Sequence, residues 1–192
     1  MSTDFFVMMH EAPWAGPAAF RIDGPEISLG RGRRLEEDPG AFAFELRVDP
    51  GADPAEFPPL DLHYPPPALP LFSKRMKTVL AAAGVDNIDY YPATVTYQPT
   101  GGALAYELAN VIGVAEGVDR ERSTFEASET GVIEVFSKLA LDESKFRGRH
   151  MTRLYELLRL LIVSRRVKDA IETAGLTGIL IVSDDEWEPG MI

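Results

Sequence analysis

The sequence predicts an α+β fold in which two similar helices pack against a mostly antiparallel or mixed β-sheet. Strand-like and helical segments follow one another as several strands, one helix, several more strands, a second helix and a final strand. A doubly wound parallel sheet would need more helices. The stretch 71–85 also recurs in altered form at 162–176. Finally, a proline-rich stretch at 49–70 sets apart a β-containing N-terminal portion, 1–70, from a core, 71–192. We expect the two to form one structural domain, with the first portion packed on the body.

The repeated stretch predicts the two helices. A shift of 91 residues makes five of the thirteen positions from the serine onward identical. The identical pairs are Ser73 and Ser164, Arg75 and Arg166, Lys77 and Lys168, Ala83 and Ala174, and Gly84 and Gly175. Serine is a preferred N-cap and glycine commonly closes a helix, so we expect Ser-capped helices at about 73–84 and 164–175. Apolar residues at i, i+3, i+4 and i+7 give each helix one buried stripe.

Both predicted helices begin with cations, although the dipole of a helix favours anions at that end. A negative group should therefore lie near each start. One interpretation is a bound phosphate or carboxylate ligand. The other is pairing with the protein's own carboxylates, which the excess of 30 acidic over 19 basic residues favours. The candidate anion-binding residues are Ser73, Arg75, Lys77, Ser164, Arg166 and Lys168.

The other elements are read from alternation and from turn residues. Period-2 alternation of apolar residues predicts a half-buried strand over 42–48. Further strands are expected at 5–9, 20–22, 88–92, 93–97, 105–112, 132–136, 139–141 and 178–182. The apolar segment 154–163 fits either a helix or a buried strand. The prolines of 49–70 predict no regular element there, so this stretch is either a polyproline connector or an extended arm on the body.

Composition limits the function classes. The chain has 192 residues and no cysteine, which excludes disulfides and thiolate catalysis and fits a reducing compartment. The first ten residues lack the basic start of a signal peptide, and no apolar run approaches the length of a membrane span. We therefore expect a cytoplasmic protein without a membrane partner.

The formal net charge of −11 argues against direct binding of nucleic acid. Residues 1–70 contain 12 acidic and 5 basic residues, so the excess is concentrated there. This charge either keeps the protein soluble or steers a basic protein partner toward it.

No motif for a metal, a cofactor or a catalytic centre is present. The three histidines, His10, His63 and His150, do not have metal-binding spacing, and we expect neither a metal nor another cofactor. A hydrolase that uses His150 and a carboxylate is a minor hypothesis. Aromatic and acidic residues are better candidates for partner binding, since aromatic rings often anchor interfaces. These candidates are Trp14, Tyr90, Tyr91, Asp184, Asp185, Glu186 and Trp187.

Several short motifs, taken in order, resemble a bacterial family of polymorphic toxin systems, immunity protein family eleven, formerly a domain of unknown function. The motifs are Leu71-Phe72-Ser73-Lys74-Arg75, Ala83-Gly84, Tyr91-Pro92, 119–123, 141–145, His150, 162–166 and 174–178. The resemblance covers about residues 70–183. It implies a protein that binds and neutralises a cognate toxin, often a nuclease, by stoichiometric inhibition in the cytoplasm. The implied partner is a basic toxin domain encoded by an adjacent gene, and the resemblance transfers no catalytic residue.

Overall fold

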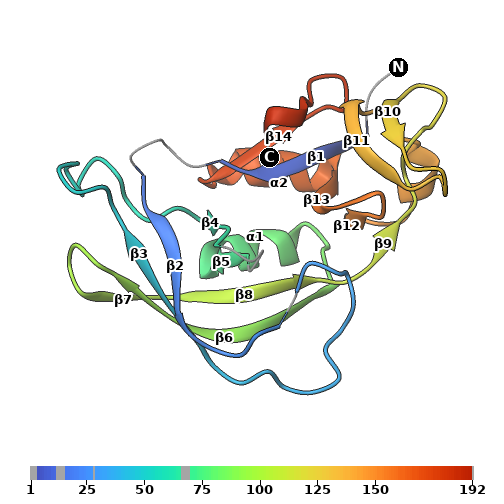
Figure 1. Ribbon diagram of the computed structural model, residues 1–192. Coiled ribbons are helices and arrows are strands. Elements are labelled where there is room, and N and C mark those ends of the chain that lie inside the picture. The colour runs from blue at the N-terminus through green and yellow to red at the C-terminus, as the bar shows by residue number, and fades with distance from the viewer. Residues whose placement is uncertain (1–3, 12–15, 28, 66–69, 192) are drawn as a thin grey trace.

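The computed structural model describes residues 4–11, 16–27, 29–65 and 70–191. Two β-sheets lie one above the other, with two helices between them (Figure 1). Sheet I has the strand order β2 (Ala18–Asp23), β3 (Phe42–Arg47), β6 (Ile88–Tyr97), β8 (Tyr106–Val111), β5 (Leu71–Ser73) and β4 (Leu62–His63), with β7 (Gly102–Leu104) paired to β6. Sheet II has the order β14 (Ile179–Val182), β1 (Phe5–His10), β13 (Leu157–Ser164), β12 (Met151–Leu154) and β9 (Val114–Ala115).

The remaining elements within the described residues are two helices, two short 3-10 helices and a hairpin. They are α1 (Lys74–Ala82), α2 (Arg165–Ala174), η1 (Glu143–Phe146), η2 (Pro189–Met191), and the strands β10 (Thr124–Ala127) and β11 (Ile133–Lys138). The pairs β3–β6 and β9–β12 are parallel, and the other named pairs are antiparallel. The predicted α+β fold with mixed sheets and two helices is thus confirmed.

The repeat seen in the sequence extends beyond the helices to the strands around them. The shift of 91 residues that aligns the helices also places Ile88, the first residue of β6, on Ile179, the first residue of β14. In each copy the helix connects two strands of the same direction that flank an antiparallel strand. That strand is β8 in sheet I and β1 in sheet II, so the orders β6-β8-β5-β4 and β14-β1-β13-β12 are equivalent. The two halves therefore share one arrangement of strands and helix, although the central antiparallel strand follows the helix in the first copy and precedes it in the second.

The hydrophobic core explains why some strands gave no clear periodicity. The central cluster joins both helices to the inner faces of both sheets, through residues such as Met76, Val167 and Leu161. A second cluster covers the opposite face of sheet II and includes Leu160 and Ile162 of β13. Because β13 is buried on both faces, apolar residues occupy successive positions rather than alternate ones. The segment 154–163 is thus a strand over most of its length.

Several boundaries differ from the sequence-based expectation. The segments 88–92 and 93–97 form one strand, β6, that continues through Pro92. The proline-rich stretch contains the two-residue strand β4, so the expectation of no regular element there was wrong. Residues 139–141 form no strand and contribute only an isolated bridge from Leu141 to Val118. The strands β7, β9, β10 and β12 were not expected, since each is short or lacks alternation.

The two helices neutralise each other's dipoles. In α1, Arg75 donates from its guanidinium to the carbonyl of Ala174 at the end of α2. The equivalent residue of α2, Arg166, donates over 3.2 Å to the carbonyl of Ala82 at the end of α1. Cations stabilise the C-terminal end of a helix, where carbonyls lack intrahelical partners. One cation near each helix start, Arg75 or Arg166, therefore serves the other helix, which explains part of a feature that looks unfavourable in the sequence.

We expect Arg166→Met to lower the free energy of unfolding by about 1 kcal/mol, because Ala82 loses both a hydrogen bond and a nearby positive charge. Urea unfolding followed by circular dichroism measures this loss. Arg31→Met is the matched control, since Arg31 is exposed and forms no ion pair or hydrogen bond among the described residues. Equal effects of the two substitutions would contradict the proposed exchange of helix caps.

Candidate functional site

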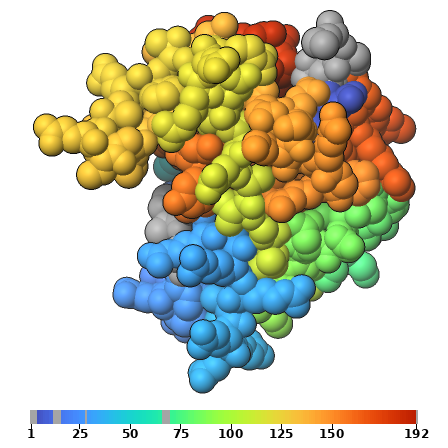
Figure 2. Space-filling model, turned by 90° about the vertical axis from the view of Figure 1, so that its right-hand side faces the viewer, coloured from blue at the N-terminus to red at the C-terminus, as the bar shows by residue number. Residues whose placement is uncertain are grey.

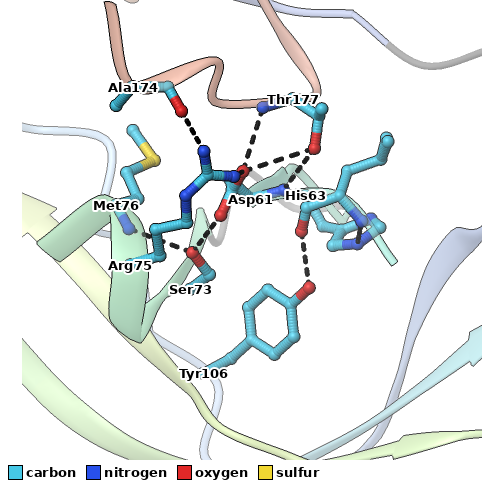
Figure 3. A network of polar contacts seen from close by, with 9 residues as sticks. Asp61, His63, Ser73, Arg75, Met76, Tyr106, Ala174 and Thr177 are labelled. Atoms are coloured by element: carbon cyan, nitrogen blue, oxygen red, sulfur yellow. Dashed lines mark hydrogen bonds and ion pairs between the residues drawn. The ribbon is translucent and has the colours of Figure 1, made fainter. Parts of the chain in front are cut away.

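The start of α1 is occupied by an internal carboxylate, that of Asp61 (Figure 3). Its Oδ1 accepts a 2.6 Å hydrogen bond from Ser73 Oγ, and its Oδ2 lies 3.2 Å from Arg75 Nη1. The same serine oxygen accepts from the backbone amide of Met76 over 3.0 Å, as an N-cap does. Asp61 is only 7% exposed, and its carboxylate binds the donors of Ser73 and Arg75. It therefore fills the position that an anionic ligand would take.

Asp61 also reaches the second repeat. Its Oδ2 accepts a 3.0 Å hydrogen bond from the amide of Thr177, which follows α2, and its own backbone amide donates to the Thr177 carbonyl. The chains pass close together here, because a Cβ added to Gly178 would lie 2.5 Å from the carbonyl oxygen of Leu62. Gly178 also has φ of +79°, a conformation that other residues rarely adopt. Asp61 therefore links the start of one helix to the loop after the other.

The third candidate of the first site, Lys77, is also satisfied internally. Its Nζ lies 2.6 Å from Glu107 of β8 and 4.3 Å from the centre of the Tyr90 ring. Tyr90 in turn packs edge-on against Phe72 in the central core. Burial, with the Glu107 charge as a smaller cause, raises the pKa of the Tyr90 hydroxyl. Its neighbour Tyr91 is half-buried and packs against a third hydrophobic cluster, which includes Val95 and Leu108 of sheet I. The two tyrosines thus contribute mainly to packing.

The start of α2 is built differently. Ser164 occupies the N-cap position without a side-chain cap hydrogen bond, and its Oγ instead lies 3.0 Å from His150 Nδ1. The first helical amide, that of Arg165, donates to the carbonyl of Asp4. Lys168 pairs with Glu172 at 2.6 Å. Among the described residues no carboxylate hydrogen-bonds to His150, so the structure shows no oriented Ser-His-carboxylate arrangement for hydrolysis.

The acidic C-terminal candidates fold back onto the body. Asp184 accepts a 2.7 Å hydrogen bond from the amide of Leu141, and Glu186 accepts from the amide and hydroxyl of Ser183. Those two Ser183 bonds are the main reason that the pKa of Glu186 is lowered. Trp187 is 4% exposed and packs at right angles on Phe136. Of these four residues, Asp185 and Glu186 are exposed, whereas Trp187 belongs to the core. Trp14 lies outside the described residues.

A buried histidine stands beside the Asp61 network. The amide of Leu60 donates to His63 Nε2 over 3.1 Å, and the Tyr106 hydroxyl donates to the Leu60 carbonyl (Figure 3). Burial, assisted by the nearby ring of His10, lowers the pKa of His63 to about 4. At neutral pH this imidazole is uncharged and accepts a backbone hydrogen bond. His63 and Asp61, which sequence reasoning missed as structural residues, both lie in the proline-rich stretch, where periodicity gives no signal.

The described residues give no sign of a metal centre or a membrane segment. No group of three or more histidine, aspartate or glutamate side chains is placed to hold a metal ion within that part of the chain. No helix in the same residues is long and apolar enough to cross a membrane.

Comparison with families of known proteins matches residues 12–181 to the immunity protein family Imm11. The match covers most of the chain, so this protein belongs to that family, and the resemblance drawn from the sequence motifs is confirmed. It also extends over the N-terminal strands β2 and β3, to which the sequence motifs did not reach. A search of curated proteins gave no match.

Replacing Asp61 with asparagine keeps its size but exchanges one acceptor oxygen for a donor group. We expect a loss of about 2–3 kcal/mol in the free energy of unfolding, because donors from Ser73, Arg75 and Thr177 then face that group. Asp49→Asn is the control, since Asp49 is exposed and its carboxylate makes no hydrogen bond within the described residues. Urea unfolding of both variants measures these losses. A loss for Asp61→Asn no larger than that for Asp49→Asn would exclude the structural role.

The lowered pKa of His63 predicts acid sensitivity. Below the ordinary histidine pKa of 6.5 the unfolded chain takes up a proton that the folded protein excludes until about pH 4, so stability falls as the pH falls through this window. From pH 7.5 to 5.0 the His63 contribution amounts to roughly 2 kcal/mol. We expect His63→Gln, which can still accept from Leu60, to lose correspondingly less stability over this interval. Urea unfolding at both pH values measures it, and identical losses would contradict the assignment.

Proposed function

We propose that this protein binds a cognate bacterial toxin domain and neutralises it by forming a stoichiometric complex. Membership of the immunity protein family is the observation that carries this proposal. The internal satisfaction of both helix starts supports it, because the groups that would otherwise bind a small anion are engaged in holding the fold. The role requires surface complementarity and no turnover.

The charge of the chain favours a basic toxin. A formal net charge of −11 attracts cationic partners and speeds their encounter. A toxin that acts on nucleic acid carries clustered cations for the phosphate backbone, so a nuclease suits an acidic inhibitor well. Several acidic residues lie together on the surface, such as the exposed run Glu36, Glu37 and Asp38. We place the encounter in the cytoplasm, where an inhibitor protects the cell that makes the toxin, and expect an adjacent gene to encode that toxin.

The alternative function, binding of a small phosphate or carboxylate, has less support. At α1 the carboxylate of Asp61 already takes the hydrogen bond from Ser73 and pairs with Arg75. At α2 the first amide is bound by the Asp4 carbonyl, and Lys168 is paired with Glu172. A ligand anion would have to displace these contacts at either helix.

Calorimetric titration against the toxin domain encoded beside this gene tests the proposal, with the toxin inactivated by a catalytic-site substitution. We expect one-to-one binding with a submicromolar dissociation constant that weakens as salt rises from low to physiological ionic strength, because charge attraction is screened. An unrelated basic protein of similar size serves as the control for nonspecific attraction. Absence of binding at both salt concentrations, or equal binding of the control, would refute the proposed function.

A further inference from the structure

The hairpin formed by β10 and β11 stands apart from both sheets. Its strands pair only with each other among the described residues, and the loop between them runs from Ser128 to Val132. In the space-filling view the segment coloured yellow to light orange projects from one side of the molecule (Figure 2). A two-stranded hairpin is marginally stable by itself, so its persistence here requires support from the body.

Most of that support lies at the root of the hairpin, although Arg120 also donates to the carbonyl of Gly131 in the loop and Ile133 packs against the second core cluster. Phe136 packs edge-on against Phe125 at 5.9 Å between ring centres and against Trp187 at 6.4 Å. Preceding residues are tied to the body, since Arg122 pairs with Asp119 at 2.6 Å and also donates to the Leu141 carbonyl. Phe136 and Trp187 are both buried. The root is thus fixed by aromatic packing and by polar contacts, which holds the tip in a defined position.

The tip, defined here as residues 126–135, combines exposed apolar side chains with unpaired acids. Val132 is 63% exposed and Val135 53%, the former being the most exposed of the large hydrophobic residues described. Glu126, Glu129 and Glu134 are exposed and take part in no ion pair within the described residues. The tip itself contains no lysine or arginine. Glu126 lies directly across from Val135 in the ladder, so one acid and one valine share a face.

We infer that the tip of this hairpin is a docking element for the toxin, an inference that rests on the proposed function. The occupant is a basic toxin domain, because three unpaired glutamates attract a cationic cleft while the two valines supply apolar area once contact is made. Projection from the body lets the tip enter a concave surface such as a nucleic-acid-binding cleft. Its preorganised root limits the conformational entropy lost on binding.

The same tip residues could serve two roles that do not involve the toxin. Charged residues on a free strand edge protect it from pairing with other chains, in which case the glutamates act only against aggregation. Alternatively, the exposed valines could meet a second copy of this chain. Because neither role requires the toxin, a measurement with the toxin present distinguishes both from docking.

The experiment compares two triple charge reversals in the full chain. The test variant carries Glu126→Lys, Glu129→Lys and Glu134→Lys, and the matched control carries Glu36→Lys, Glu37→Lys and Asp38→Lys. Both sets replace exposed acids, and both change the formal net charge equally. A third variant, Val132→Ser with Val135→Ser, removes apolar area without changing charge. Binding kinetics to the inactivated toxin domain are measured for each, with thermal unfolding to confirm the fold and light scattering to give the oligomeric state.

We expect the test reversal to weaken toxin binding by about a hundredfold, mainly through slower association, and the control reversal by less than about tenfold. The double serine variant should dissociate about tenfold faster, with its association rate unchanged. If the wild type binds the toxin and the test reversal weakens binding no more than the control reversal does, the docking role is overturned and the proposed function stands. No binding by the wild type would overturn both. Wild-type self-association abolished by the test reversal would assign the tip to a second copy instead.

Discussion

The buried carboxylate of Asp61 joins the two repeated units, and much of the interior depends on it. It binds the hydroxyl of Ser73 at the start of α1, the guanidinium of Arg75, and the amide of Thr177 after α2. A buried charge is tolerated only when paired and fully hydrogen-bonded, and these donors satisfy that condition. The close approach at Gly178 then follows, because the backbone must come within hydrogen-bonding distance of residues 61 and 62.

The arginine exchange between the helices extends the same arrangement. Arg75 contacts both Asp61 and the end of α2, while the equivalent Arg166 contacts the end of α1. Because the helices are antiparallel, one cation near each start lies beside the negative end of the neighbouring helix. The duplicated sequence thus provides a symmetric solution for the helices, whereas the carboxylate at Asp61 belongs to one unit only. The units remain alike in order but differ in how their helix starts are capped.

The internal pairing of the charged groups at the helix starts has a consequence for function. The charged groups at the start of α1 are engaged with other groups of the fold, so they serve stability, and the proposed recognition of a partner falls to the surface. An inhibitor that works by complementarity needs a rigid body that presents exposed groups in fixed positions. The aromatic root beneath the hairpin and the linked helices both contribute such rigidity, while the exposed acids suit the basic partner that we propose. Membership of the immunity family is consistent with a protein built in this way.

The sequence alone determined the fold class, the positions of the two helices and the family. These features rest on local signals: apolar periodicity, a serine and a glycine at the helix ends, and short motifs in a fixed order. Only the tertiary structure decided what the cations at the helix starts do, because their partners are up to 99 residues away in the chain. It also decided that 154–163 is largely strand, since burial on both faces removes the alternation that marks a strand. Asp61 is a charged residue among prolines and Trp187 lies between acidic residues, yet long-range packing buries both and leaves the apolar Val132 and Val135 of the hairpin exposed.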